Sequence, residues 1–167
     1  IQTKLLNAGE SDIEGLELEL SVLPTPQWKV DVGLSWLNAE YVKFDVDDGQ
    51  GGLASLKGNK LPQAPEFTAN VGVQYTQSLA DVGDVLMRLD YYYSAEKFFS
   101  QFNTTVQDSY DLLNARISFE MHDNWKFSLF GKNLTDELVF SSVQDFAGLL
   151  TTLMPPRTYG ADIEYRF

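Results

Sequence analysis

The segment Ile13-Glu14-Gly15-Leu16-Glu17-Leu18-Glu19-Leu20-Ser21-Val22 alternates between apolar and polar residues almost without interruption. Successive side chains of a β-strand point to opposite faces, so the leucines share one face while Glu17 and Glu19 share the other. About ten residues is also the length that a tilted strand needs to cross a bilayer. The segment therefore predicts a β-strand with one apolar and one acidic face.

Six further segments repeat this alternation along the chain. They lie at residues 28–36, 67–76, 85–94, 113–121, 125–132 and 158–167. No helical period competes with them, and no run approaches the roughly 18 to 20 apolar residues of a membrane-spanning helix. The sequence therefore predicts an all-β fold.

The connections between the seven strands alternate between short and long. The segments near residues 24–26, 81–83 and 122–124 are short, whereas residues 45–65, 100–109 and 134–156 form long loops. In an antiparallel up-and-down meander, this order places every tight turn at one end and every long loop at the other, as in bacterial outer-membrane barrels. We expect Phe167 to lie at the end with the tight turns.

Composition and charge narrow the classes of protein that fit. Hydrophobic residues make up 44% of the chain, yet the mean hydropathy is -0.20, so apolar and polar residues must be finely interleaved. A net charge of -12 disfavours a nucleic-acid partner, which needs clustered cations, and the absence of cysteine excludes disulfides and thiolate metal sites. Because Ile1 begins within an alternating pattern, without a secretion signal, we expect the chain to be a piece of a longer protein.

The two faces of the predicted strands differ in charge. The polar face carries both acidic and basic residues, and we expect the opposite face to carry no charge at all. Aromatic residues are expected to form two interfacial girdles, one of Trp28, Tyr75, Trp125, Tyr165 and Phe167 at the turn end and one of Trp36, Tyr41, Tyr91 and Tyr93 near the loops. A soluble sandwich would scatter such rings through its middle. The pattern favours a transmembrane barrel with its apolar face toward lipid.

Four stretches resemble the C-terminal barrel of TonB-dependent receptors: residues 13–19 (IEGLELE), 61–67 (LPQAPEF), 131–137 (GKNLTDE) and 155–160 (PPRTYG) running on to Tyr165-Arg166-Phe167. The resemblance covers nearly the whole chain. It implies that residues 1–167 form one C-terminal segment, a partial transmembrane β-barrel of about seven to eight of 22 strands, counting a partial strand at residues 1–6. One departure is Leu138-Val139-Phe140, where the usual aromatic residue after Asn-Leu-Thr-Asp is displaced.

The resemblance also implies function and partners. Such a receptor lies in the bacterial outer membrane, surrounded by its lipid, and takes up a scarce nutrient, here expected to be a bulky solute of the iron-siderophore type. Its barrel holds a plug domain, and energy comes from the TonB complex through an N-terminal part that is absent here. Phe167 resembles the terminal signal that barrel-insertion machinery reads.

Candidate binding residues fall into two groups. Loop residues that could contact the ligand are Asp47, Asp48, Phe98, Phe99, Phe102, Asn103, Phe140 and Phe146. Charges expected to line the lumen and face the plug are Glu17, Glu19, Arg88, Arg116, Asp162 and Glu164. For the loop aspartates, the alternative is that they solvate the surface or bind divalent ions among lipopolysaccharides.

We expect no enzymatic activity. Carboxylates spaced i,i+2 on a strand, such as Glu17 and Glu19, are what any polar lumen wall provides. His122 is the single histidine and sits in a predicted turn, so it supplies neither a metal-ligand set nor a triad. No phosphate loop or nucleophile elbow is present, so no catalytic residue, metal or cofactor is expected.

Two other architectures remain open from the sequence. The first is a small eight-stranded barrel, structural or a passive pore, that uses residues 1–6 as its first strand. That half-length strand would leave a gap in a hydrogen-bonded wall that lipid does not tolerate. The second is a soluble binding module of the sandwich or lipocalin type, whose apolar face would be protected from solvent by protein.

Overall fold

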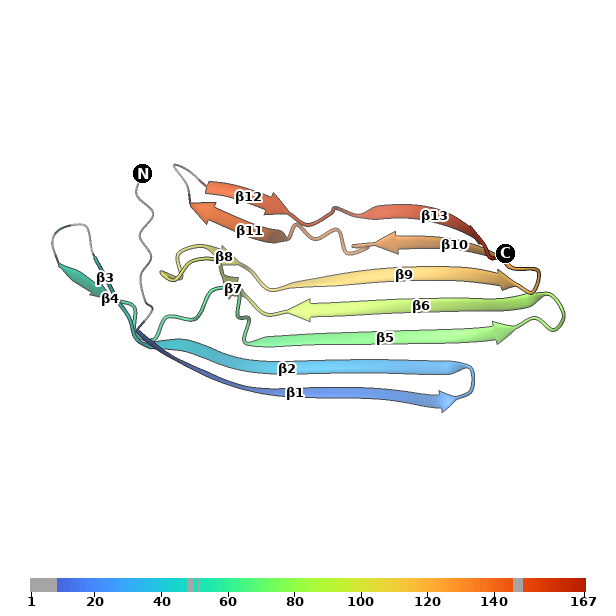
Figure 1. Cartoon of the computed structure of the whole chain (residues 1–167), viewed down its shortest axis with the longest axis horizontal. Coiled ribbons are helices and arrows are strands. Elements are labelled where there is room, and N and C mark those ends of the chain that lie inside the picture. The colour runs from blue at the N-terminus through green and yellow to red at the C-terminus, as the bar shows by residue number, and fades with distance from the viewer. Residues whose placement is uncertain (1–8, 48–49, 51, 146–148) are drawn as a thin grey trace.

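Seven long strands pair into one antiparallel sheet in the order in which they follow along the chain. The computed structural model describes residues 9–47, 50, 52–145 and 149–167. The strands, in sheet order, are β1 (Glu10–Thr25), β2 (Trp28–Lys43), β5 (Phe67–Ser78), β6 (Gly83–Ser94), β9 (Tyr110–Met121), β10 (Trp125–Lys132) and β13 (Thr158–Tyr165). Figure 1 shows them side by side from β1 to β13, which confirms the predicted all-β meander.

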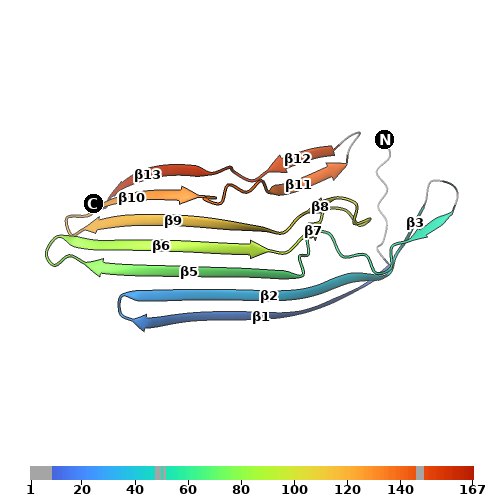
Figure 2. The same cartoon turned by 180° about the vertical axis from the view of Figure 1, so that it is seen from behind.

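The tight turns and the long loops lie at opposite ends of this sheet. The turns that join β1 to β2, β5 to β6 and β9 to β10 gather at one end, where the chain terminus also lies (Figures 1 and 2). This confirms the predicted position of Phe167. Among the described residues there is no helix long and apolar enough to cross a membrane.

The long loops contain three short hairpins that the alternating pattern did not reveal. They pair β3 (Asp45–Asp47) with β4 (Leu53–Ser55), β7 (Lys97–Phe98) with β8 (Val106–Gln107), and β11 (Phe140–Asp145) with β12 (Leu149–Leu153). All three lie at the loop end of the sheet (Figure 1). Strands of two to six residues are too short to establish a period, so sequence alternation could not distinguish them from loop.

Strands β1 and β2 extend past the predicted apolar stripe, and this corrects one expectation. Pairing is regular from Val22 back to Ser11, so Asp12 and Glu14 fall on the same face as Leu16, opposite Glu40 and Asn38. The prediction that this face carries no charge is therefore wrong beyond Leu16. Asp111 on β9, which pairs with Tyr93, also falls on this face, so its charges lie at the loop end of β1, β2 and β9.

Tyr41 was expected in the aromatic girdle near the loops, and that assignment is wrong. Counting along β2 from Trp36, alternation places Tyr41 on the opposite face. Its side chain is only 7% exposed and packs with Phe44, Val46 and Leu56, with its ring centroid 4.9 Å from that of Phe44. This cluster forms a small apolar core beneath the β3–β4 hairpin.

The apolar face of the sheet is uncovered over most of its area. Leu16 is 71% exposed, Leu129 62% and Ile163 66%. A sandwich would require a second sheet packed about 10 Å away, but the other sheets among the described residues are the two-stranded hairpins. An uncovered apolar surface of this extent marks contact with lipid or with another protein.

Aromatic rings gather at the two ends of this uncovered face. At the turn end, the Trp28 and Tyr75 centroids lie 4.8 Å apart, as do those of Trp125 and Tyr165. Phe167 continues the second group, 5.6 Å from Tyr165. Near the loops, Trp36 pairs in register with Phe67, whose ring lies 6.1 Å from that of Tyr93. These two groups are called the turn-side belt and the loop-side belt below.

Candidate functional site

Ion pairs cross from strand to strand on the polar face of the sheet. Arg88 on β6 reaches over β5 to Asp31 on β2, with Nη1 3.3 Å from Oδ2, and its Nη2 lies 2.7 Å from Asp90 Oδ1. Gly72 on β5 lies beneath the guanidinium, and a Cβ at that position would collide with Nη2. The missing side chain of Gly72 therefore lets Arg88 lie flat along the wall and connect three strands.

A second bridge of the same kind joins β9 to β13. Arg116 reaches across β10 to Asp162, with Nη1 3.0 Å from Oδ1. The centroid of the Phe130 ring on β10 lies 5.1 Å from Arg116 Cζ and 5.6 Å from Lys132 Nζ. A Cβ on Gly160 would collide with that ring. Here too, a glycine gives a large side chain room to lie against the wall.

The described residues give Glu17 and Glu19 no such partner. Both lie on β1 opposite Ser35 and Gly33, which offer no cation. Glu19 borders a shallow recess of about 390 Å³ that Asp31 and Asn70 also line. Asp31 is already held by Ser21 Oγ at 2.7 Å and Lys29 Nζ at 3.1 Å. Of the two carboxylates at this recess, Asp31 is therefore held by its neighbours in the sheet, whereas Glu19 has no such partner among the described residues.

The six predicted lumen charges thus separate into two kinds. Arg88, Arg116, Asp162 and Glu164 form ion pairs within the wall, whereas Glu17 and Glu19 do not pair within the described part of the chain. Arg166 follows the last strand, and its Nε donates a hydrogen bond to Glu164 at 2.9 Å. This contact raises the pKa of the Arg166 guanidinium. Partly exposed pairs of this kind each contribute about 1 kcal/mol or less. Their main effect here is to neutralise the wall.

The predicted ligand contacts are spread over the three hairpins. Asn103 serves as a clip: its Oδ1 accepts a hydrogen bond from Lys60 N at 2.7 Å, and its Nδ2 donates to Lys60 O at 2.9 Å. Phe98 lines a recess of about 220 Å³ beside this clip. Phe102 is exposed nearby. The loop at residues 99–105 is therefore anchored to the segment that precedes β5.

The remaining candidates lie apart from this clip. Asp47 ends β3 and is exposed. Phe140 begins β11, where its backbone N donates to the buried Gln107 Oε1 at 2.8 Å. Asp48 and Phe146 lie outside the described residues, and so does the partial strand expected at residues 1–6.

A cation among aromatic rings is the main feature that the sequence analysis missed. Lys97 Nζ lies 5.8 Å from the ring centroid of Phe99 and 5.9 Å from that of Tyr110. The ring centroids of Tyr110 and Tyr92 lie 6.1 Å apart. Alternation places Tyr92 on the face of Arg88 and Tyr110 on the face of Arg116. The group of Tyr92, Lys97, Phe99 and Tyr110, the loop-end cluster, therefore lies at the loop end of the polar face.

Asn133 joins two of the quoted motifs. Its Oδ1 accepts from Glu137 N at 3.0 Å, while its Nδ2 donates to Glu137 O at 2.9 Å and to Pro155 O at 3.4 Å. Arg157 Nη2 then lies 2.6 Å from Asp136 Oδ2. Val139, within the Leu138-Val139-Phe140 stretch that departs from the expected motif, is only 1% exposed. Both ends of the last long loop are thus fixed together.

The sheet is an antiparallel meander whose apolar face lies between two aromatic belts and whose polar face carries ion pairs. Its tight turns lie at one end and its long loops at the other. Together these features define a segment of a transmembrane β-barrel wall. Comparison with known proteins identifies which kind. Residues 2–134 match the family model described as TonB dependent receptor-like, beta-barrel, and the chain belongs to that family. It is therefore part of an integral β-barrel of the bacterial outer membrane.

Individual relatives agree with this assignment. The chain is 26% identical over 145 residues to the probable TonB-dependent siderophore receptor PiuA of Acinetobacter baumannii, covering 83% of this chain and 19% of that protein. It superposes on the ferric yersiniabactin uptake receptor FyuA from Yersinia pestis with a TM-score of 0.81 at 22% identity, covering 96% of this chain and 24% of that one. The crystal structure of PiuA gives a TM-score of 0.77 at 21% identity, with 93% and 22% covered. The chain spans about a fifth of the length of its curated relative.

Proposed function

We propose that this chain forms part of the barrel of a receptor that imports an iron-siderophore-type complex across the outer membrane with energy from TonB. The observation that carries the proposal is the family match over residues 2–134, joined by a relative named as a probable TonB-dependent siderophore receptor. The proposed activity is transport, and no chemical reaction is assigned to the chain.

The polar face of the sheet is proposed to hold the plug domain. Because Arg88 and Arg116 already have carboxylate partners in the wall, the charges left to engage a plug are Glu17 and Glu19. A carboxylate facing an enclosed lumen without a counter-charge is costly. Because β1 is an edge strand of this sheet, a barrel strand paired with it is the alternative source of a cation, and we propose the plug as the partner. This narrows the predicted set of lumen contacts from six residues to two.

The loop end is proposed to contact the ligand. The loop-end cluster offers rings and a cation, and Lys97 forms no ion pair with the described residues. Aromatic rings suit a bulky, partly planar solute, and a lysine suits its anionic groups. Phe98, Phe102, Asn103, Phe140 and Asp47 remain proposed contacts together with Asp48 and Phe146, since loops of the remaining barrel share the site.

Two further partners are part of the proposal. Phe167 ends the turn-side belt, with its ring edge-on to that of Tyr165, and a terminal aromatic at that rim is available to barrel-insertion machinery. The TonB complex would act through the part of the protein that precedes this chain. Residues 1–167 are accordingly proposed to act as one C-terminal segment of the barrel.

Iron uptake in whole cells tests the proposed function. Cells that carry the complete receptor should accumulate radiolabelled iron from one siderophore, and accumulation should be lost in cells that lack the receptor or lack TonB. A panel of catecholate, hydroxamate and mixed siderophores identifies the solute. Accumulation that persists without TonB would contradict the proposal in favour of a passive pore, and a lack of response to every chelate would exclude iron as the cargo.

A further inference from the structure

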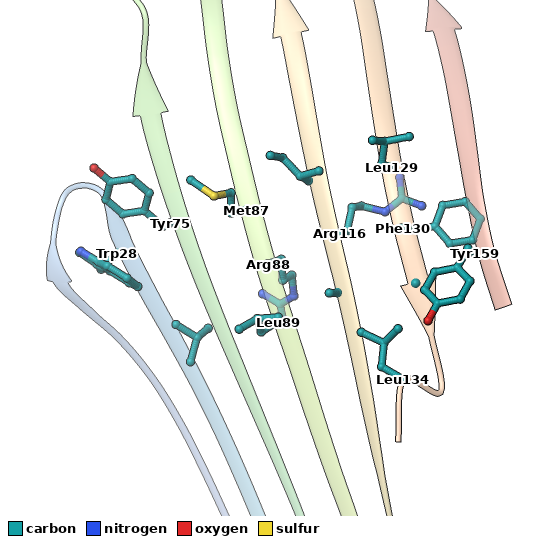
Figure 3. A pocket seen from close by; sticks show the side chains of 14 residues that line it. Trp28, Tyr75, Met87, Arg88, Leu89, Arg116, Leu129, Phe130, Leu134 and Tyr159 are labelled. Atoms are coloured by element: carbon teal, nitrogen blue, oxygen red, sulfur yellow. The ribbon is translucent and has the colours of Figure 1, made fainter. Parts of the chain in front are cut away.

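Two hollows in the structure differ in what surrounds them. The larger, of about 610 Å³, lies on the apolar face of the sheet and is part of the lipid-facing surface (Figure 3). The smaller, of about 220 Å³, is lined by Lys60 and Glu66 from the loop before β5 and by Phe98 and Asn103 from the loop between β6 and β9. Its shape therefore depends on how these two loops are held together.

The side chain of Asn103 takes the place of a neighbouring strand for Lys60. Lys60 forms an isolated antiparallel bridge with Glu40 of β2, and the residues on either side of it, Asn59 and Leu61, make the backbone hydrogen bonds to β2, both at 2.9 Å. The backbone N and O of Lys60 therefore point away from β2. Asn103 binds both of them, accepting from N at 2.7 Å and donating to O at 2.9 Å.

The amide of Asn103 has no hydrogen-bond donor left for a ligand. A side-chain amide carries two N–H donors, and Nδ2 donates to Ser100 O at 3.2 Å as well as to Lys60 O. The backbone φ of 53° lies in the left-handed region, which asparagine adopts more readily than most residues. Asparagine therefore suits this turn through both its backbone and its side chain, and both donors of its amide hold loop backbone.

Two further hydrogen bonds join the same two loops. Asn59 Nδ2 donates to Gln101 O at 2.9 Å, and Gln63 N donates to Phe98 O at 2.7 Å. The β7–β8 hairpin itself consists of two paired residues on each strand, and a hairpin this short is not stable alone. The contacts with the segment before β5 therefore hold the hairpin that carries part of the loop-end cluster.

We infer that Asn103 is a positioning residue of the ligand site, acting through the placement of Lys97 and Phe99 and not through its own amide. This role rests on the proposed function, and it refines the place of Asn103 among the proposed contacts. A hairpin that had to be ordered when the solute binds would lower the affinity, because immobilising its side chains costs free energy. Asn103 holds the hairpin before the solute arrives and so raises the affinity.

Hydrogen exchange of the complete receptor without siderophore tests whether Asn103 holds the hairpin. Asn103→Gly removes the amide, while glycine accepts a φ of 53°. We expect roughly tenfold faster exchange across residues 59–63 and 97–105, the effect of about one lost hydrogen bond. Gln101→Gly is the matched control, because it adds the same backbone freedom to the same turn and leaves the bonds of Asn103 in place. Asn103→Asp keeps the acceptor for Lys60 N but loses both donors, and its exchange should be intermediate.

Siderophore binding and uptake test the positioning role itself. The probes are the ferric catecholate, hydroxamate and mixed siderophores of the uptake panel. Asn103→Gly should raise the Kd about tenfold and leave the maximal uptake rate at saturation unchanged, whereas Gln101→Gly should change neither. In a Lys97→Ala, Phe99→Ala background, Asn103→Gly should weaken binding little further, because the side chains that it positions are gone. An equal loss in that background would overturn the inference by showing that Asn103 acts independently of them.

The two measurements separate this role from the proposed function. Equal exchange in Asn103→Gly and Gln101→Gly would overturn the inference, whichever solute the receptor carries. If no siderophore of the panel binds the unchanged receptor, the proposed function fails. If the unchanged receptor binds one and Asn103→Gly binds it equally well, only the positioning role fails.

Discussion

At the scale of single residues, the wall is organised by where side chains are missing. Gly72 lies under Arg88, and Gly160 lies under the Phe130 ring. In each case a large side chain on the neighbouring strand lies over the glycine, and a Cβ at the glycine position would collide with it. The glycines therefore decide whether the long side chains lie along the wall or project into the lumen.

Gly72→Ala should weaken the bridge from Arg88 to Asp31, because the new methyl group occupies the place of Nη2. We expect a loss of about 1 to 3 kcal/mol in the free energy of unfolding, the usual cost of overpacking, measured by thermal denaturation of the complete receptor. In an Arg88→Ala background the same substitution should cost much less. Equal costs in both backgrounds would show that Arg88 is not the cause.

Asn133→Ala should loosen the last long loop, since its side chain is the common partner of Glu137 and Pro155. Leaving such groups unpaired costs about 1 to 3 kcal/mol, and we expect faster proteolysis between residues 134 and 156. Asn124→Ala is the matched control: both asparagines have positive φ, 50° and 69°, but Asn124 lacks these side-chain bonds. Similar proteolysis of both variants would assign the effect to backbone strain alone.

At the scale of elements, alternation was a sufficient guide wherever a strand has one apolar and one polar face. It located all seven strands of the sheet. It failed at Tyr41 and Glu14, because β1 and β2 continue beyond the apolar stripe and polarity there no longer marks a face. The loop-end cluster was not predictable either, since Lys97 reaches Tyr110 only when the β7–β8 hairpin folds back onto β9.

A lysine on each face of β5 tests the orientation of the sheet. Val71 lies on the apolar face between Val32 and Tyr91, and Val71→Lys should destabilise the barrel by about 2 to 4 kcal/mol, the cost of a lysine near the centre of the bilayer. Asn70→Lys, one residue away on the polar face, should be tolerated. The measurement is the amount of assembled receptor in outer membranes. The reverse order would mean that the apolar face is inside.

At the scale of the whole molecule, the sheet separates three environments. Lipid meets the apolar face, and in the proposed receptor the lumen would meet the ion-paired face while the loops that carry the loop-end cluster would meet the external medium. The family follows from motifs spread over the chain, but the cargo does not. Residues on loops of the missing strands would complete the ligand site, so the sequence of this segment carries only part of the specificity.

Replacing Glu17 and Glu19 together by glutamine should loosen the plug in the complete receptor. Both carboxylates lose the charge that would engage a basic plug residue, so cells should become more permeable to an antibiotic too large for ordinary porins. Glu14→Gln, on the opposite face of the same strand, should have no such effect. Unchanged permeability in the double variant would show that the plug is held elsewhere.

The two arginines that form ion pairs across a neighbouring strand, Arg88 and Arg116, also affect the charge that the polar face would present to a transported solute. Arg88 and Arg116 keep their carboxylate partners whether or not a plug is present, because those partners lie on β2, β6 and β13 of the same wall. In the proposed receptor, these guanidinium groups would stay neutralised when the plug moves, and an anionic cargo would find few cations on this part of the wall to delay it. The same ion pairs would then keep this side of the proposed pathway from trapping the cargo.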